Sequence, residues 1–361
     1  MEDLVNYQQL RSYYKGKRVF ITGHTGFKGI WLKAILHMFG ATVKGYSLEP
    51  EDSKPFYQLF SSYKMEENII ADIRDKEKLK AEIIAFQPDF VFHLAAQSLV
   101  LRSYKIPSET FEINVVGTAN ILEALQTLDK KCTTIIITTD KVYENKEKNI
   151  LYKEDDILGG YDPYSASKAC TEIVVQSFRN AFFNIEKLDL HEKAISSARA
   201  GNVIGGGDWN EDRIIPDCIR SLMNNEAINV RNPGAVRPWQ HVLEPLSGYL
   251  LLGMQLDKQP GMFSKPFNFG PYQDDHLTVK ELVELVIKIW GKGKIKISNN
   301  INAHHEANLL QLDIQRAISE LKWQPRLTAQ EAIQWTIDWY KKDIDQQAEF
   351  TFRQIDNYFK K

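Results

Sequence analysis

The stretch Arg18-Val-Phe-Ile-Thr-Gly-His-Thr-Gly-Phe-Lys-Gly29 decides the fold of this chain. Its first five residues are mostly apolar and β-branched, which predicts a short buried strand that ends at Thr22. Residues 30–39 carry apolar side chains at helical spacing, and Gly40 ends that pattern. A second strand is predicted at residues 41–46. Together these elements form one strand–helix–strand unit of about thirty residues, the usual size of such a unit.

The same alternation continues along the chain. Strands are predicted at residues 68–72, 89–94, 133–138 and 194–199. Helices are predicted at residues 76–86, 109–128 and 163–179, with Gly117 as a point of close packing. Strands that alternate with helices in this way predict an α/β fold, a doubly wound parallel sheet of the Rossmann type.

Beyond Gly201 the pattern changes, which predicts a smaller mixed region. A Gly- and Asp-rich loop at 205–209 is followed by a Pro- and Arg-rich stretch near 231–238 and by predicted helices at 279–290 and 329–342. We assign residues 1–204 to a Rossmann domain that binds a dinucleotide, with returning segments near 238–270. Residues 205–237 and 271–361 are assigned to a C-terminal lobe that binds substrate over the carboxyl edge of the sheet.

Charge and cysteine content exclude several classes of function. The formal net charge is −2, so the chain lacks the basic excess of a nucleic-acid-binding protein. Its three cysteines have no close pairing or metal-ligand spacing, which indicates reduced thiols and no metal site. The N-terminus has no apolar signal core, and no apolar run is long enough to span a bilayer. We expect a cytoplasmic protein that binds neither nucleic acid nor membrane.

The glycines at positions 23, 26 and 29 predict a cofactor site. A helix that starts directly after a strand presents unpaired backbone N–H groups, and glycines let a pyrophosphate approach them. An ordinary tight turn would show the same glycines, but the strand before them and the helix after them favour a dinucleotide. The tip of the second strand has neither an acidic residue for a ribose 2′-hydroxyl nor an arginine for a 2′-phosphate, and we favour NAD over NADP.

Other strand ends complete the predicted cofactor site. Asp72 is placed to accept a hydrogen bond from adenine and Ile73 to pack beneath its ring, although a plain surface turn would read the same way. The small residues after the fourth strand leave space for a dinucleotide to cross the sheet. The candidate cofactor residues are Gly23, His24, Thr25, Gly26, Phe27, Lys28, Gly29, Asp72, Ile73, Leu94, Ala95, Ala96, Gln97, Thr138, Tyr164 and Lys168.

A tyrosine and a lysine predict the catalytic chemistry. Tyr164 and Lys168 lie one helical turn apart, and a fixed ammonium near a phenol is expected to lower the phenol pKa, as a base for a secondary alcohol requires. The spacing alone is not specific, because Tyr13 and Lys17 show it too. That second pair precedes the first strand, and we expect it to be structural.

The end of the fifth strand carries Thr139, Asp140 and Lys141. The threonine hydroxyl can hydrogen-bond an alcohol that is being oxidised. Asp140 is either a turn former or a general acid that protonates a departing hydroxyl. Lys141 is either a solvated charge or a second proton-transfer group.

These residues together resemble the extended short-chain dehydrogenase/reductase superfamily. The resemblance is carried by residues 22–29, His93-Leu-Ala-Ala-Gln97, Tyr164-x-x-x-Lys168 and Arg199-Ala-Gly-Asn-Val203. More narrowly, the chain is similar to CDP-glucose 4,6-dehydratases, through Thr139-Asp-Lys-Val-Tyr143, Gly160-Tyr-Asp-Pro-Tyr164, residues 199–209, 212–217 and 236–242, and His305-Glu-Ala307. The resemblance spans roughly residues 17–342.

The resemblance implies a reaction in which a sugar is oxidised, dehydrated and reduced in one site. Tyr164, assisted by Thr139 and Lys168, would remove the C4 hydroxyl proton while hydride passes to NAD. Water would then leave across C5 and C6 with Asp140 as acid, and the hydride would return to C6, converting CDP-glucose to CDP-4-keto-6-deoxyglucose in deoxysugar biosynthesis, such as that of lipopolysaccharide O-antigen. The dTDP-glucose branch places a glutamate where this chain has Lys141, so Lys141, a water or Tyr164 remain candidates for the C5 base.

The resemblance also implies the substrate contacts and the assembly. Candidate substrate residues are Ser98, Asn202, Arg213, Arg237 and His305. For Asn202, Arg213 and Arg237 the alternative is a surface or interdomain salt bridge, and for His305 the alternative is a structural role. A homodimer or homotetramer is expected from the superfamily. The rival functions are a nucleotide-sugar 4-epimerase, a dehydratase that acts on another nucleoside diphosphate hexose, and a catalytically silent scaffold.

Overall fold

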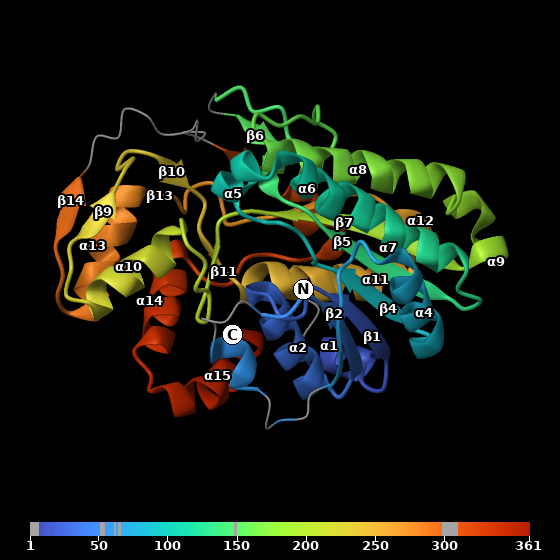
Figure 1. The fold of residues 1–361 in the computed structure, drawn as a ribbon, viewed down its shortest axis with the longest axis horizontal. Helices are drawn as coiled ribbons and strands as arrows, with labels where there is room; N and C mark the ends of the chain where they lie inside the picture. The colour runs from blue at the N-terminus through green and yellow to red at the C-terminus, as the bar shows by residue number, and fades with distance from the viewer. Residues whose placement is uncertain (1–6, 51–54, 61–62, 64–65, 148–149, 298–309) are drawn as a thin grey trace.

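The fold is a parallel sheet with helices on both faces and a smaller region beyond the carboxyl ends of the strands (Figure 1). A computed structural model describes residues 7–50, 55–60, 63, 66–147, 150–297 and 310–361. The seven strands lie in the order β12-β7-β5-β4-β1-β2-β3, and every neighbouring pair is parallel. Their bounds are β1 Arg18–Thr22, β2 Thr42–Ser47, β3 Glu66–Ile70, β4 Phe90–His93, β5 Cys132–Ile137, β7 Lys193–Ala200 and β12 Phe267–Phe269. The predicted α/β class and doubly wound sheet are confirmed.

The first strand–helix–strand unit forms where the glycine-rich stretch predicts it. Strand β1 has the predicted bounds, and α2 (Phe27–Phe39) begins three residues before the predicted start because Gly26 already serves as its N-cap. Gly40 adopts a left-handed conformation with φ 76°, and its N–H returns to the last carbonyls of the helix. The element at residues 66–70 starts and ends two residues before its predicted position, a shift of the size expected for strand ends.

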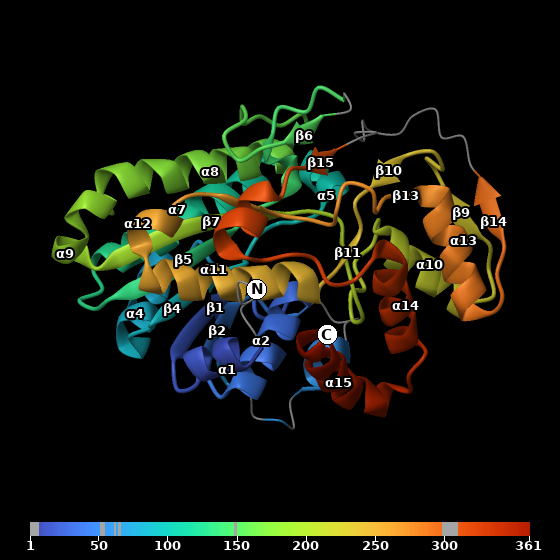
Figure 2. The same ribbon diagram turned by 180° about the vertical axis from the view of Figure 1, so that it is seen from behind.

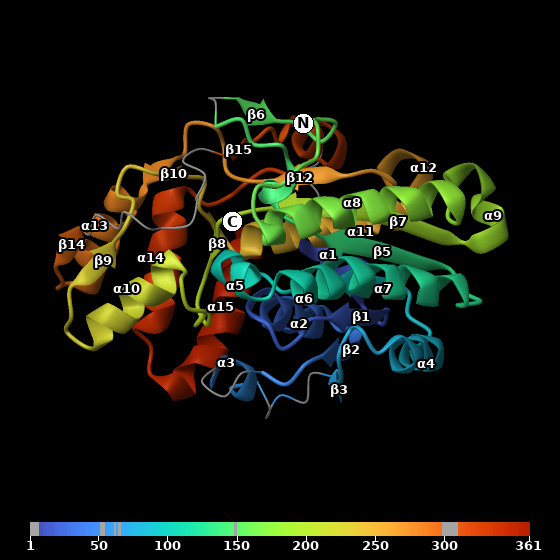
Figure 3. The ribbon, with the colours of Figure 1, turned by 45° about the horizontal axis from the view of Figure 1, so that its top comes forward.

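Side chains that alternate along the strands pack into two separate hydrophobic cores, one on each face of the sheet. Val19 and Ile21 pack into one core, whereas Phe20 between them packs into the other. The first core lies under α2, α11 (Leu243–Lys258) and α15 (Gln347–Lys360), seen from behind in Figure 2. The second core lies under α4 (Lys76–Phe86), α7 (Gly117–Gln126) and α8 (Pro163–Ala181), which Figure 3 shows side by side.

The long helix predicted at residues 109–128 is built of three consecutive parts. They are α6 (Pro107–Phe111), a π-helical segment at Glu112–Val116, and α7. The π-helical segment carries Asn114, which is buried. Gly117 packs on Ile73 so closely that a β-carbon there would lie 2.8 Å from Ile73 Cγ2, which agrees with the predicted close-packing point.

The smaller region lies beyond the carboxyl ends of the strands, on the left in Figure 1. It contains α10 (Ile214–Met223), β9 (Ile228–Val230), β10 (Val236–Arg237), β13 (Leu277–Thr278), α13 (Val279–Trp290), β14 (Ile295–Ile297) and α14 (Ala329–Tyr340). The chain returns to the sheet through α11, which packs on β5 and β7, and through β12. The domain boundaries at 204, 237 and 270 stay a prediction. Within the described residues, none of the helices has the length and apolar character to cross a membrane.

Candidate active site

The turn after β1 can hold glycine alone at two positions. Gly23 has φ +75°, and a β-carbon there would lie 2.7 Å from the backbone nitrogen of Ala95. A β-carbon on Gly29 would lie 2.2 Å from the carbonyl oxygen of Gly23. The end of β1, the start of α2 and the end of β4 therefore meet within backbone distance. The first backbone N–H groups of α2 face this shared edge, the arrangement that binds a pyrophosphate.

Two polar side chains of this turn point into the protein. The His24 side chain is buried against Gly45 and near the ring of Tyr57, and burial lowers its pKa to about 3. The Thr25 hydroxyl lies 2.8 Å from Ser47 Oγ and donates to the carbonyl oxygen of Leu48 at 3.0 Å, which ties the turn to the tip of β2. These side chains therefore stabilise the turn, and the backbone of the turn faces the carboxyl ends of the strands.

The residues after β3 and β4 are held by local contacts. Asp72 accepts from Arg74 Nη2 at 2.6 Å, which lowers the pKa of that carboxyl, and Ile73 is buried beneath Gly117. The Gln97 side chain donates to Thr110 Oγ1 at 3.1 Å and accepts from the Leu99 backbone at 2.7 Å. The roles predicted for this group in binding a dinucleotide stay predictions.

Sequence reasoning missed Asn114, which is buried in the π-helical segment. Its side chain accepts from the Gln97 backbone at 2.9 Å and donates to the Gln97 carbonyl at 3.1 Å and to Ser167 Oγ at 2.8 Å. It therefore joins the end of β4 to the helix that carries Tyr164. A polar residue on the buried face of a predicted helix was the signal in the sequence.

Tyr164 lies in the first turn of α8. The helix begins at Asp162, whose carboxylate accepts from the Ser165 backbone at 2.9 Å, and Pro163 occupies the first helical position. Burial raises the pKa of Tyr164 to about 12, while a hydrogen bond to Thr139 and the charge of Arg213 act in the opposite direction. The pKa of Tyr164 is therefore raised overall, and the prediction that Lys168 lowers it stays a prediction.

The Lys168 ammonium binds the backbone at the end of β5. Its Nζ donates to the carbonyl oxygen of Ile137 at 3.0 Å, and burial lowers its pKa to about 8. Glu172, one helical turn further along α8, acts in the opposite direction and raises the pKa of Lys168. The other tyrosine–lysine pair is structural, as predicted: Tyr13 on α1 (Tyr7–Tyr14) donates to Asp257, and Lys17 lies 5.6 Å from the centre of its ring.

The turn after β5 brings an acid beside the phenol. Thr139 precedes the turn Asp140–Val142 and donates from Oγ1 to Asp140 Oδ1 at 2.8 Å. Asn202, after β7, donates to Asp140 Oδ2 at 3.3 Å, and Lys141 Nζ lies 3.9 Å from Asp140 Oδ1. Asp140 is buried and the Lys141 side chain is about one-third exposed. The Thr138 hydroxyl instead donates to Glu172 Oε1 at 2.5 Å.

Most of the predicted catalytic and substrate residues line one cleft of about 620 Å³. Those that line it are Lys28, Ser98, Thr139, Asp140, Lys141, Tyr164, Asn202, Arg213 and Arg237. Arg213 reaches Asp208 Oδ2 at 3.0 Å and Ser98 Oγ at 3.4 Å, and Arg237 donates to the Val236 carbonyl at 3.0 Å. Asp208 was not predicted, although it lies in the Gly- and Asp-rich loop. His305 falls outside the residues that the structure describes.

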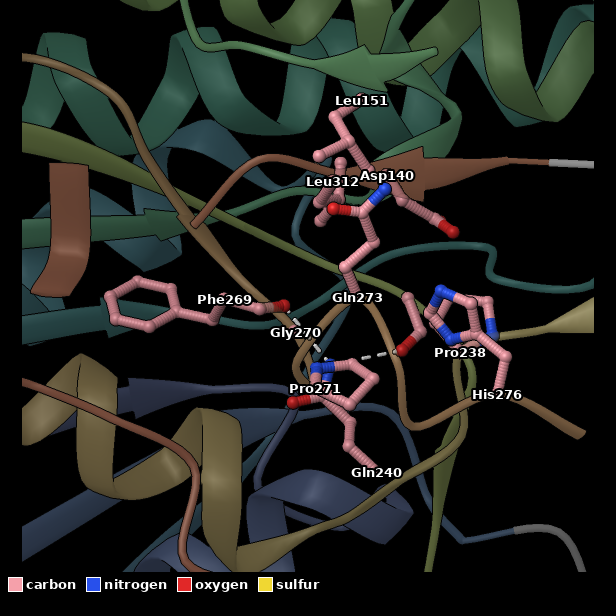
Figure 4. Close-up of a pocket in the computed structure, with 11 residues that line it drawn as sticks. Asp140, Leu151, Pro238, Gln240, Phe269, Gly270, Pro271, Gln273, His276 and Leu312 are labelled. Atoms are coloured by element: carbon pink, nitrogen blue, oxygen red, sulfur yellow. Dashed lines mark hydrogen bonds between the residues drawn. The ribbon is translucent and has the colours of Figure 1, made fainter. Parts of the chain in front are cut away.

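A second, water-sized cavity lies behind Asp140 and Gly201 (Figure 4). The amide of Gln240 borders it and donates from Nε2 to the carbonyl oxygens of Gly201 at 3.1 Å and Phe269 at 3.0 Å. One amide thus ties the segment after β7 to the end of β12. This contact fixes the backbone of the residue that faces Asp140.

Comparison with known proteins identifies the family. The family model described as GDP-mannose 4,6 dehydratase matches residues 20–336 of this chain. The chain belongs to this family. Within the family, it is 44% identical over 331 residues to the CDP-glucose 4,6-dehydratase of Salmonella typhimurium, an alignment that covers 92% of each protein. The resemblance inferred from the sequence motifs is therefore confirmed.

Solved structures share the fold of this 4,6-dehydratase family member. The epimerase Mth375 of Methanothermobacter thermautotrophicus superposes with a TM-score of 0.79 at 23% identity, covering 92% of this chain and 94% of that one. DesIV, a dTDP-glucose 4,6-dehydratase of Streptomyces venezuelae solved with NAD and TYD bound, gives a TM-score of 0.76 at 21% identity, covering 90% and 97%. At these identities the likeness establishes the fold.

Proposed function

We propose that this protein is an NAD-dependent CDP-glucose 4,6-dehydratase, a lyase that forms CDP-4-keto-6-deoxyglucose. The observation that carries the proposal is that Tyr164, Thr139 and Asp140 line one cleft, where the Thr139 hydroxyl donates to the Asp140 carboxyl at 2.8 Å. A base for C4 and an acid for C6 therefore share one cleft. The 44% identity to the Salmonella enzyme supports the same substrate.

The glycine-rich turn fits a dinucleotide. Side chains at Gly23 and Gly29 would collide with backbone, so the turn stays open to a pyrophosphate, with the α2 N-terminus directed at it. Bound NAD would supply the hydride acceptor for C4 and the hydride donor for C6. The carboxyl ends of β1, β3, β4 and β5, with the candidate cofactor residues, all lie on this edge of the sheet.

The first step needs a base at the C4 hydroxyl. In our proposal, the Tyr164 phenolate takes the hydroxyl proton while Thr139 hydrogen-bonds the same oxygen. The Lys168 ammonium, which donates to the carbonyl oxygen of Ile137 at 3.0 Å, would be the cation that stabilises the phenolate.

The second step needs a base at C5 and an acid at C6. The C4 ketone acidifies the C5 proton, which leaves to a base, and Asp140 protonates the C6 hydroxyl so that it departs as water. We assign the C5 base to Lys141, which would accept the proton as the neutral amine, because its side chain lines the same cleft as Asp140 and Tyr164. The same base would then return its proton to C5 as C6 is reduced.

The far end of the cleft suits a diphosphate. Arg213 and Arg237 line it, and guanidinium groups bind phosphate oxygens through paired hydrogen bonds. Asp208 already orients the Arg213 guanidinium. A cytoplasmic location, a homodimer or homotetramer, and a part in O-antigen deoxysugar synthesis rest on the resemblance and belong to this proposal.

One experiment separates this function from its rivals. The purified protein is incubated with CDP-, UDP-, dTDP- and GDP-hexoses, and the mass of each product is measured. We expect CDP-glucose to lose one water without net accumulation of NADH, because the hydride returns to the product. An unchanged mass with an inverted C4 centre would show an epimerase, and no conversion of any sugar nucleotide would refute the proposal.

A further inference from the structure

Helix α8 carries a third ionisable residue in line with Tyr164 and Lys168. Glu172 follows Lys168 by four residues, so the two side chains lie on the same face of the helix, one turn apart. Both side chains are buried. An acid thus lies directly behind the proposed catalytic ammonium, on the side away from the cleft.

Every oxygen of this acid is engaged. Glu172 Oε1 accepts from Thr138 Oγ1 at 2.5 Å, and Oε2 accepts from Ser197 Oγ at 2.7 Å and from Arg199 Nη2 at 3.0 Å. Both side chains of the ion pair with Arg199 are 3% exposed. Such pairs rarely stabilise a fold more than apolar residues would, so this one calls for a functional explanation.

The pair brackets the turn that carries the acid and the threonine of the site. Glu172 holds Thr138 on one side of Thr139 and Asp140. Arg199 Nη1 donates to Tyr143 Oη at 2.9 Å on the other side. Tyr143 in turn donates to Asn268 Oδ1 of β12 at 2.7 Å. The turn is therefore fixed at both ends by one buried network.

The charges around Lys168 explain why an acid is needed there. Lys28 on α2, whose pKa is lowered to about 7, presents a like charge to Lys168 below that pH, and His93 on β4, whose pKa falls to about 3, stays neutral. Among the described residues, Glu172 is the anion that opposes the effect of burial on the pKa of Lys168. Arg199 and Arg179 are the cations that face Glu172 itself.

We propose that Glu172, paired with Arg199, is a positioning residue that keeps the Lys168 ammonium charged for the oxidation at C4. This inference rests on the proposed function. Glu172 touches neither sugar nor cofactor in it, and acts through Lys168 and Thr138. Its removal would take away the anion one turn from Lys168 and leave the charge of Arg199, on β7, without its partner, so Lys168 would lose its proton at lower pH.

The test is the pH profile of kcat for CDP-glucose in the full-length wild type and in Glu172→Gln. Activity that needs the ammonium is lost as pH rises through the pKa of Lys168. We expect the alkaline limb of the Glu172→Gln profile to move to lower pH by about one unit, with bound NAD retained. The matched control is Glu244→Gln on α11, a buried acid that accepts from Tyr358 Oη at 2.8 Å and faces no catalytic group. Its profile should keep the wild-type midpoint although its thermal stability falls.

Two further results decide the matter. Glu172→Asp keeps the charge and should keep the alkaline midpoint at a lower kcat, so it serves as the test if Glu172→Gln does not fold. The inference would be overturned if the alkaline midpoint of Glu172→Gln equalled that of the wild type. It would also be overturned if the alkaline limb of Glu172→Asp moved to lower pH by about one unit. If the wild type itself releases no dehydrated product, the proposed function fails instead, which is a different result.

Discussion

Gly201 faces Asp140 so closely that a β-carbon on it would lie 2.0 Å from Asp140 Cγ. The glycine follows β7 and the acid follows β5, and Asn202 beside the glycine donates to the same carboxyl at 3.3 Å. The acid therefore occupies a space that exists because residue 201 has no side chain.

Replacing this glycine should displace the acid. We expect Gly201→Ala to lower kcat for dehydration by about 100-fold, because a displacement of about 1 Å at a reacting group has that effect. Steady-state product formation, with bound NAD measured in parallel, checks this. Gly261→Ala is the matched control, since a β-carbon there would meet no atom within 4 Å. Equal kcat in the two variants would contradict the assigned position of the acid.

The phenol is expected to be indispensable for the first step. Tyr164→Phe removes the phenol oxygen from the cleft but keeps the ring. We expect at least about a 1000-fold loss of kcat, in the range of general base catalysis, with no NADH absorbance after CDP-glucose is added and with NAD still bound. Near-wild-type turnover would remove Tyr164 from the role of base.

The sequence predicted local elements best where the stop and start signals are themselves local. Helix α13 has the predicted bounds because Thr278 and Glu281 form a capping box and Gly291, with φ 99°, ends the helix. The turn at Gly23 was predictable for the same reason. Such signals need no knowledge of distant residues.

What the sequence could not predict depends on contacts between distant segments. The His24 ring packs against Gly45 instead of facing the sheet edge, because the approach of β2 to α2 decides its direction. The pKa of Tyr164 follows burial, which a helical spacing does not reveal. Asn114 acts through Ser167, a partner 53 residues further along the sequence that only the folded chain brings near.

Loss of the acid should separate oxidation from water loss. Asp140→Asn keeps the shape of the side chain but cannot protonate the C6 hydroxyl. We therefore expect C4 oxidation to proceed and the reaction to stall, so that NADH absorbance rises to about one equivalent per site after CDP-glucose is mixed in. Product formed at the wild-type rate would show that the proton comes from another group.

Lys28 should make ligand binding depend on pH. It lines the cleft, and burial together with the charges of Arg213 and Lys168 lowers its pKa to about 7. Below that pH the ammonium is charged and attracts a phosphate, and above it the attraction is lost. We expect the Kd of NAD, or of CDP, to rise by about tenfold per pH unit between about pH 7 and pH 9, since a bound phosphate raises the lysine pKa.

Titration calorimetry in two buffers of different ionisation enthalpy would check this, because binding above neutral pH must then take up a proton. In Lys28→Met the affinity should be lower near pH 6 and nearly independent of pH, and proton uptake should vanish. Lys187→Met, an exposed lysine of the turn Ile185–Lys187, is the matched control and should titrate like the wild type. Proton uptake that survives in Lys28→Met would assign it to another group of the cleft.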